Sequence, residues 1–312
     1  MQKKFFISIL LFFLPVIMGY TLVEWLTRGI PSTYAINQKV LETKPNSLET
    51  IVLGSSQLMN AVNAEWISVP TINLASGNQH HDTDFKLLQG VSPQLKQLKT
   101  VVLEVSYSHF ELPHNGPEFW KNAVYLEYYN VNCYERFTYF KDRLLYLSNP
   151  SVFSRELVDH YVNGKYAPQF NEAAFNAADM YGQFERENYD LKTINAMKTF
   201  KINTTENSQI FKTNASLYFK LLKYIEKQGW NVVICTTPTY TTYLHAQNPN
   251  ILKRRDSILE VTKIKYPNAR FLLKESDTLN YQIKDFWNQS HLSPSGAKKF
   301  SQSLDSLLHT MR

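Results

Sequence analysis

Four short apolar runs, rich in β-branched residues and closed by small polar residues, constrain the fold of this chain most strongly. Runs of this kind are typical of strands that are buried on both faces of a parallel sheet. Residues 270–273 form a weaker fifth run. The four runs are Thr50–Leu53, Thr71–Leu74, Thr100–Val105 and Asn231–Cys235.

Helical patterns separate these runs, at 57–66, 82–97, 214–228, 251–265 and 294–311. Strands that alternate with helices predict a doubly wound, mostly parallel α/β fold.

Residues 107–213 interrupt the alternation, because they are crowded with Tyr, Phe and Asn and contain no clear strand. This stretch predicts a largely helical insertion between the third and fourth strands. Its aromatic side chains either pack inside the insertion or form a surface on which sugars stack.

The N-terminus predicts a membrane anchor. The 19 residues from Phe5 to Val23 carry no charge, and at about 1.5 Å per residue they nearly span a bilayer core of ~30 Å. Lys3 and Lys4 precede this run and favour an orientation with the N-terminus inside the cell. The alternative is a cleaved signal peptide, but only weak cleavage sites lie near Gly19.

We therefore expect three parts in the chain. Residues 1–28 form the anchor, the polar residues 29–48 form a stalk, and residues 49–312 form a domain on the extracytoplasmic side of the membrane.

Composition excludes several classes of protein. The 33 basic and 27 acidic residues give a net charge of +6, but the longest basic run has three residues, so no nucleic-acid partner is expected. Two cysteines provide neither a disulfide framework nor a zinc site. His80, His81 and Asp82 are adjacent and lack the spacing of metal ligands, while His109 and His114 are interpreted as surface or packing residues. No metal or cofactor is predicted.

Polar residues with catalytic potential follow two of the strands and precede the last helix. Gly54-Ser55-Ser56 follows the first strand, where a helix N-terminus offers amide donors, although a serine there can also be a simple N-cap. Residues 73–78 follow the second strand, and their amides could serve an oxyanion hole. His291 lies in the loop before the terminal helix.

In chain order, these three segments resemble the SGNH/GDSL hydrolase superfamily over about 50–105 and 230–311. That family has a Gly-x-Ser nucleophile after strand one, an Asn-x-Gly-type turn after strand two, and Asp-x-x-His in the last loop. The resemblance implies that Ser56 is the nucleophile, that Ala75 stands in the place of the second-block glycine, and that His291 is the general base. The most specific match is His-Leu-Ser-x-x-Gly-Ala, which starts at His291.

The chain departs from the family pattern in three places. Ala75 replaces a glycine but keeps its amide, so Ser56 and Ala75 are the expected oxyanion donors. The third-block Asn is missing, which leaves Ser106 or Asn78 as candidates for a further donor. Asn288 stands where the family has Asp three residues before the histidine, and Asp285 is the rival for that third position.

The overall layout resembles membrane-anchored SGNH-like proteins of the teichoic-acid D-alanylation and alginate O-acetylation type. Those proteins work beside a polytopic membrane-bound O-acyltransferase, which the resemblance implies as a partner here. It also implies that Ser56 accepts an acyl group and passes it to a glycan hydroxyl, or to water as an esterase does. The alternative is a catalytically impaired domain that binds glycan or scaffolds a membrane acyltransferase. The missing third-block Asn and the replacement of the family Asp by Asn288 favour this alternative.

Overall fold

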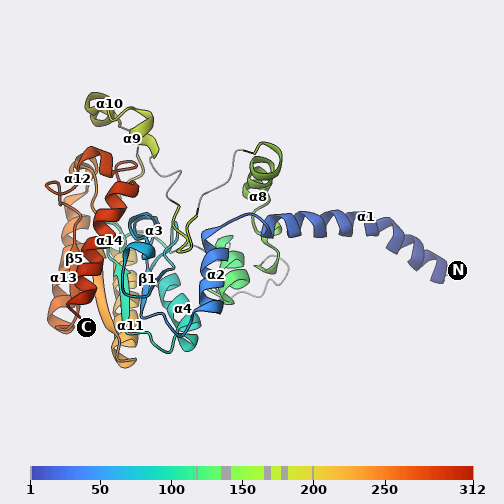
Figure 1. Ribbon diagram of the computed structural model, residues 1–312, viewed down its shortest axis with the longest axis horizontal. Helices are drawn as coiled ribbons and strands as arrows, with labels where there is room; N and C mark the ends of the chain where they lie inside the picture. Colours follow the sequence, from blue (N-terminus) through green and yellow to red (C-terminus); the bar gives the residue numbers. More distant parts are fainter. Residues whose placement is uncertain are drawn as a thin grey trace.

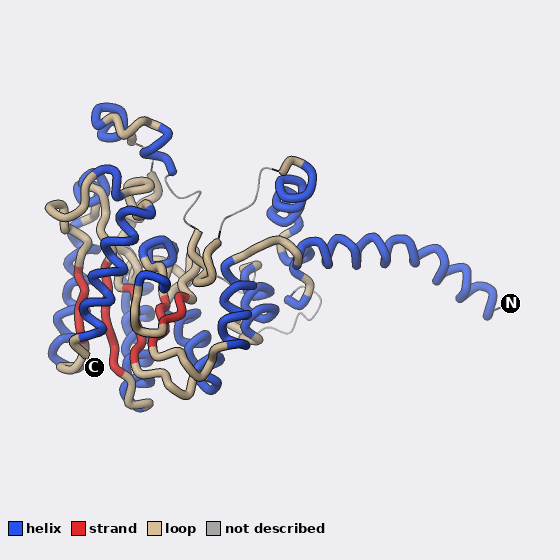
Figure 2. Tube along the Cα trace, in the orientation of Figure 1, coloured by secondary structure: helices blue, strands red, loops and turns tan. Residues whose placement is uncertain are grey.

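A five-stranded parallel sheet lies at the centre of the computed structural model, which describes residues 2–114, 116, 119–134, 142–164, 170–176, 182–198 and 200–311 (Figures 1 and 2). Its order is β2-β1-β3-β4-β5. The strands are β1 (Thr50–Leu53), β2 (Thr71–Asn73), β3 (Thr100–Glu104), β4 (Asn231–Thr236) and β5 (Arg270–Leu273). The predicted parallel α/β fold is thereby confirmed.

Strands β1, β3 and β4 bury both of their faces, which explains why their sequences are continuously apolar, while β5 at the edge of the sheet is half exposed. Ile51 and Leu53 belong to one core and Val52 to the other. The first core is covered by α2 (Thr33–Thr43), α4 (His81–Val91), α5 (Lys121–Tyr129), α11 (Ser208–Lys227) and α13 (Pro249–Lys265). The second is covered mainly by α3 (Ser56–Ala61) and α14 (Pro294–His309).

Helix α1 (Gln2–Arg28) projects away from the domain (Figure 1) and is, by length and composition, a candidate membrane span. Its last turns are fastened to the domain. The buried carboxylate of Glu24 accepts hydrogen bonds from the backbone amides of Leu145 and Tyr146 at 2.8 and 3.0 Å. Arg28 forms ion pairs with Glu24 and Glu127.

Residues 29–48 differ from the expected stalk, because α2 packs against the sheet domain. Leu41 is part of the first core, and Asn37 Nδ2 donates to the carbonyl of Asn73 at 2.8 Å. Tyr34 hydrogen-bonds Ser76 Oγ at 2.6 Å. These three residues of α2 lie three and four positions apart, so they share one helix face. The rest of the segment is polar, and for this reason its composition predicted a stalk.

The described part of the segment between β3 and β4 consists of short helices joined by loops, with one isolated bridge between Phe170 and Asn176. Tyr125 and Tyr129 are buried in the first core beside Tyr34, so these aromatic side chains serve packing. Tyr139 lies outside the described residues. Besides α5, the segment holds α7 (Leu145–Ser148), α8 (Pro150–Leu157), the π-helical turn η3 (Val158–Val162), α9 (Gly182–Arg186) and α10 (Leu191–Ala196).

Gly54 connects the sheet to α3 and offers a test of this arrangement. The register pairs Leu53 with Leu103, which puts Gly54 beside Glu104. A Cβ on Gly54 would lie 2.7 Å from the Glu104 side chain, and its φ of +155° is one that L-residues rarely adopt. We predict that Gly54→Ala lowers the free energy of unfolding by about 2–4 kcal/mol. Denaturant unfolding of the detergent-solubilised chain measures this.

The matched control is Gly19→Ala, where nothing lies within 4 Å of the added methyl group. Equal stability of the two variants would contradict the packing described for Gly54.

Candidate active site

Ser56 is positioned by the turn between β1 and α3. In this strand order, β1 and β3 flank the point where the connections reverse direction, which is where ligands bind in open α/β sheets. Ser55 is the N-cap of α3, and its hydroxyl accepts from the amide of Gln57 at 3.2 Å. Ser56 is the first helical residue, and its own amide has no acceptor among the described residues.

His291 reaches Ser56 from the far end of the sequence. Its Nε2 lies 2.8 Å from Ser56 Oγ. The loop that carries it is closed by an antiparallel bridge between Phe286 and Leu292. At the start of α14, a Cβ on Gly296 would lie 2.1 Å from the carbonyl oxygen of Asp285, so only glycine allows this close approach of helix and loop. The structure thus brings together Ser56 and His291, the two residues for which the sequence suggested the roles of nucleophile and base.

Asn288 fixes the orientation of His291 and its tautomer. Asn288 Oδ1 accepts from the backbone amides of Ser290 and His291 at 2.9 and 3.0 Å, so it must be the oxygen that points toward them. The same oxygen lies 3.1 Å from His291 Nδ1. Because an amide oxygen can only accept, the Asn288 contact selects the tautomer in which Nδ1 carries the proton and Nε2 accepts from Ser56; Ser290 Oγ also lies 3.1 Å from this Nδ1.

The protonation of His291 is set mainly by burial. His291 is partly exposed toward a cavity but otherwise enclosed, and this burial lowers its pKa to about 4, against an opposing contribution from the charge of Glu104. The imidazole is therefore neutral near pH 7, as a general base must be.

Asp285, the rival third member, makes its contacts elsewhere. It is buried, and its carboxylate binds Lys299 Nζ at 2.6 Å, the amide of Gln282 at 2.8 Å and Ser295 Oγ at 3.0 Å. These bonds fasten α14 to the preceding turn, η4 (Ile283–Asp285).

The candidate oxyanion donors are not all available. The Ala75 amide donates to Asn73 Oδ1 at 3.0 Å, because the Asn side chain folds back on its own turn, and Ala75 does not line the cavity at Ser56. Asn78 and Ser106 do line that cavity. The Ser106 hydroxyl is bonded to Gln57 Oε1 and Glu104 Oε1. Of the two expected backbone amide donors, only that of Ser56 is without an acceptor among the described residues.

Glu104, at the end of β3, is the residue that sequence reasoning missed. Its fully buried carboxylate accepts from the Ser55 amide and the Ser55 hydroxyl, each at 2.7 Å, and from the Leu58 amide at 3.3 Å. A carboxylate is stabilised at a helix N-terminus, so Glu104 holds the nucleophile turn in place. The available signal was an acidic residue inside an otherwise apolar strand.

A cavity of about 450 Å³ opens in front of Ser56 and His291. His109, expected at the surface or in packing, and His80 are buried residues of its wall. Burial, with further contributions from the charges of His109, His114 and Lys201, lowers the pKa of His80 to about 3, so this ring is neutral. Residues of the segment between β3 and β4 form part of the wall: Ser108, His109, Leu112, Pro113, Lys201, Ile202 and Asn203.

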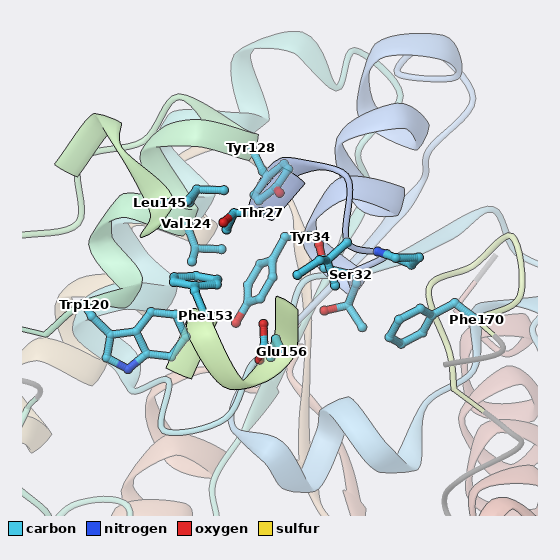
Figure 3. Close-up of a pocket in the computed structure, with 13 residues that line it drawn as sticks. Thr27, Ser32, Tyr34, Trp120, Val124, Tyr128, Leu145, Phe153, Glu156 and Phe170 are labelled. Atoms are coloured by element: carbon cyan, nitrogen blue, oxygen red, sulfur yellow. The ribbon is translucent and has the colours of Figure 1, made fainter. Parts of the chain in front are cut away.

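A second cavity, of about 170 Å³, lies where α1 joins the domain (Figure 3). Phe153, Trp120 and Val124 form its apolar side, and Glu156 lies at its polar side. No histidine is among its lining residues, so it lacks the serine–histidine pair of the first cavity.

Comparisons with known proteins add little to this geometry. No protein-family model matches the chain, and no curated protein matches it in sequence. Among solved structures, the chain is similar to a protein described as a "putative acylhydrolase" from Bacteroides fragilis, with 10% identity and a TM-score of 0.43. That similarity covers 89% of this chain and 96% of the other. A likeness this distant carries no argument about function.

The contacts of Asp285 predict a structural role. Asp285→Ala removes the buried ion pair with Lys299 and should lower the free energy of unfolding by about 1–3 kcal/mol, because Lys299 is partly exposed. Lys299→Ala removes the same pair and should cost a similar amount. Thermal unfolding of both variants measures the loss. A loss of serine reactivity in Asp285→Ala as complete as in His291→Ala would instead make Asp285 the third member.

Proposed function

We propose that this protein is a membrane-anchored serine acyl-transfer enzyme that acts on a cell-envelope glycan from the extracytoplasmic side. The observation that carries the proposal is the 2.8 Å contact between Ser56 Oγ and His291 Nε2, in a tautomer fixed by Asn288. A serine hydroxyl next to an oriented neutral imidazole is the arrangement that nucleophilic catalysis requires.

The reaction has two balanced steps. In the first, Ser56 Oγ attacks the carbonyl carbon of an acyl ester, its proton passes to His291 Nε2, and the leaving alcohol takes that proton. In the second, a sugar hydroxyl gives its proton to His291 and attacks the acyl-serine, and Ser56 recovers the proton as it leaves. Water in place of the sugar would make the protein an esterase. The Ser56 amide stabilises the oxyanion in both steps.

The Asn288 side chain supports activity more than its lack of charge suggests. An Asn in this place harms a serine enzyme when its amide nitrogen faces Nδ1, because the histidine then takes the wrong tautomer. Here the two backbone amides of Ser290 and His291 keep the oxygen toward Nδ1. The site loses the charge of an aspartate but keeps the required tautomer.

The cavity wall favours a hydroxylated acceptor. Most of the residues around Ser56 can form hydrogen bonds, among them Asn78, His80, Lys201 and Asn203, while Leu112, Pro113 and Ile202 give the wall an apolar part as well. A polyhydroxylated sugar matches such a wall better than an apolar acceptor does. A polytopic membrane acyltransferase would supply the acyl group, and α1 would hold the cavity near it.

Labelling with a serine-reactive fluorophosphonate tests the proposal. We predict that the wild-type chain is labelled on the peptide that contains Ser56, and that Ser56→Ala and His291→Ala are not labelled. Ser306→Ala, on an exposed turn of α14, is the matched control and should label like wild type. Thermal unfolding of all variants checks that they fold. A folded wild type that does not label would favour the glycan-binding or scaffolding role.

The low pKa of His291 predicts the pH dependence. Since His291 acts as a base only when neutral, kcat/KM for an aryl acetate should fall as the pH drops through about 4, rather than through the ordinary range near 6.5. Asn288→Asp places a negative charge at Nδ1, which favours the imidazolium, so this fall should shift to higher pH. An unchanged profile in Asn288→Asp would contradict the contact between Asn288 and His291.

A further inference from the structure

Exposed apolar side chains cluster beside the end of α1. Outside α1, eight large apolar side chains are exposed among the described residues, and four of them lie between residues 147 and 162. They are Leu147, Val158, Tyr161 and Val162. With the exposed Trp25 of α1, we call them the α1-proximal patch.

The patch is held rigidly against α1. Tyr161 Oη donates to the carbonyl of Leu26 at 3.0 Å. A Cβ on Gly29 would lie 2.7 Å from Tyr161 Oη. The Glu24 carboxylate caps the start of α7. In Figure 1, α8 lies beside the C-terminal end of α1 and runs across the direction of α1.

The segment that carries the patch exposes apolar side chains on its outer side, alongside the exposed Arg155, and buries others on its inner side. Phe153 is buried, packs edge-to-face on Trp120 at 5.7 Å between ring centroids, and lines the cavity of Figure 3. The domain therefore already satisfies the inner face of α8. Val162, 76% exposed, and Val158 gain nothing from that packing and need a different partner.

We infer that the α1-proximal patch lies in the interfacial region of the same bilayer that α1 spans. The inference rests on the membrane anchoring in the proposed function. The apolar surface of α1 leaves the bilayer at Trp25. The segment with the patch lies beside this point and runs across the direction of α1, so the two form one lipid-facing surface. Trp25 and Tyr161 are residue types that concentrate at the membrane interface. The exposed Arg155 of α8 is followed by Glu156 and Asp159, so the charge of this segment is mixed and the apolar side chains carry the inference.

Site-directed fluorescence in lipid vesicles tests this inference. Single cysteines are introduced in the full chain and labelled with an environment-sensitive dye, which is possible because Cys133 and Cys235 are fully buried. Val162→Cys and Leu147→Cys report on the patch. Phe12→Cys reports on the insertion of α1. Leu279→Cys, 89% exposed and far along the chain, is the matched apolar control. The chains are reconstituted in phosphatidylcholine–phosphatidylglycerol vesicles with and without nitroxide-labelled lipids.

We expect nitroxide placed shallow in the acyl chains to quench both patch labels roughly twofold, deep nitroxide to quench Phe12→Cys, and neither to quench Leu279→Cys. Two patch positions guard against a local effect of one label, and thermal unfolding of each variant checks the fold. Quenching of Phe12→Cys without quenching of either patch label would overturn the inference and leave the patch free for a protein partner. Failure of Phe12→Cys to be quenched would overturn the anchoring itself, and the inference with it.

Discussion

The arrangement of the cavity at Ser56 and His291 depends on one buried carboxylate. Glu104 ends β3 beside Gly54 and binds the amides of Ser55 and Leu58, so the turn that presents Ser56 is held by charge-assisted hydrogen bonds from the neighbouring strand. Burying a carboxylate costs several kcal/mol unless it is well bonded, and the helix N-terminus supplies that compensation. The strand, the turn and the first turn of α3 are therefore stable only together.

The same carboxylate influences the base. Asn288 provides geometry without charge, and burial disfavours the imidazolium of His291. Glu104 is the group whose charge opposes that effect. In the proposed reaction, positioning and electrostatic stabilisation of His291 are thus divided between two residues, one in the loop before α14 and one on the sheet. A single aspartate combines these roles in the usual triad.

The sequence was informative wherever a local pattern had one physical explanation. Continuous β-branched runs predicted β1 to β4, since strands buried on both faces favour such a composition, and the weaker apolar run at 270–273 predicted β5. The approach of His291 to Ser56 followed from chain order and from the edge at which parallel strands end. The role of Glu104 could not be predicted from the sequence, because it depends on the register of β3 with β1, about 50 residues earlier in the chain. The Ala75 amide was assigned by analogy, and only coordinates show that Asn73 occupies it. The packing of α2 against the sheet was not predicted, because its three inward side chains are outnumbered by polar ones.

The clamp between Glu24 and α7 has a consequence for which acceptors the cavity can serve. A domain on a flexible linker samples many heights and directions above a membrane. Here the last turn of the apolar helix is part of the folded domain, so once α1 is in a bilayer the cavity stays at one height and one tilt. Acceptors must then be presented at that level. In the proposed function, this arrangement would select substrates by their position in the envelope as well as by their chemistry.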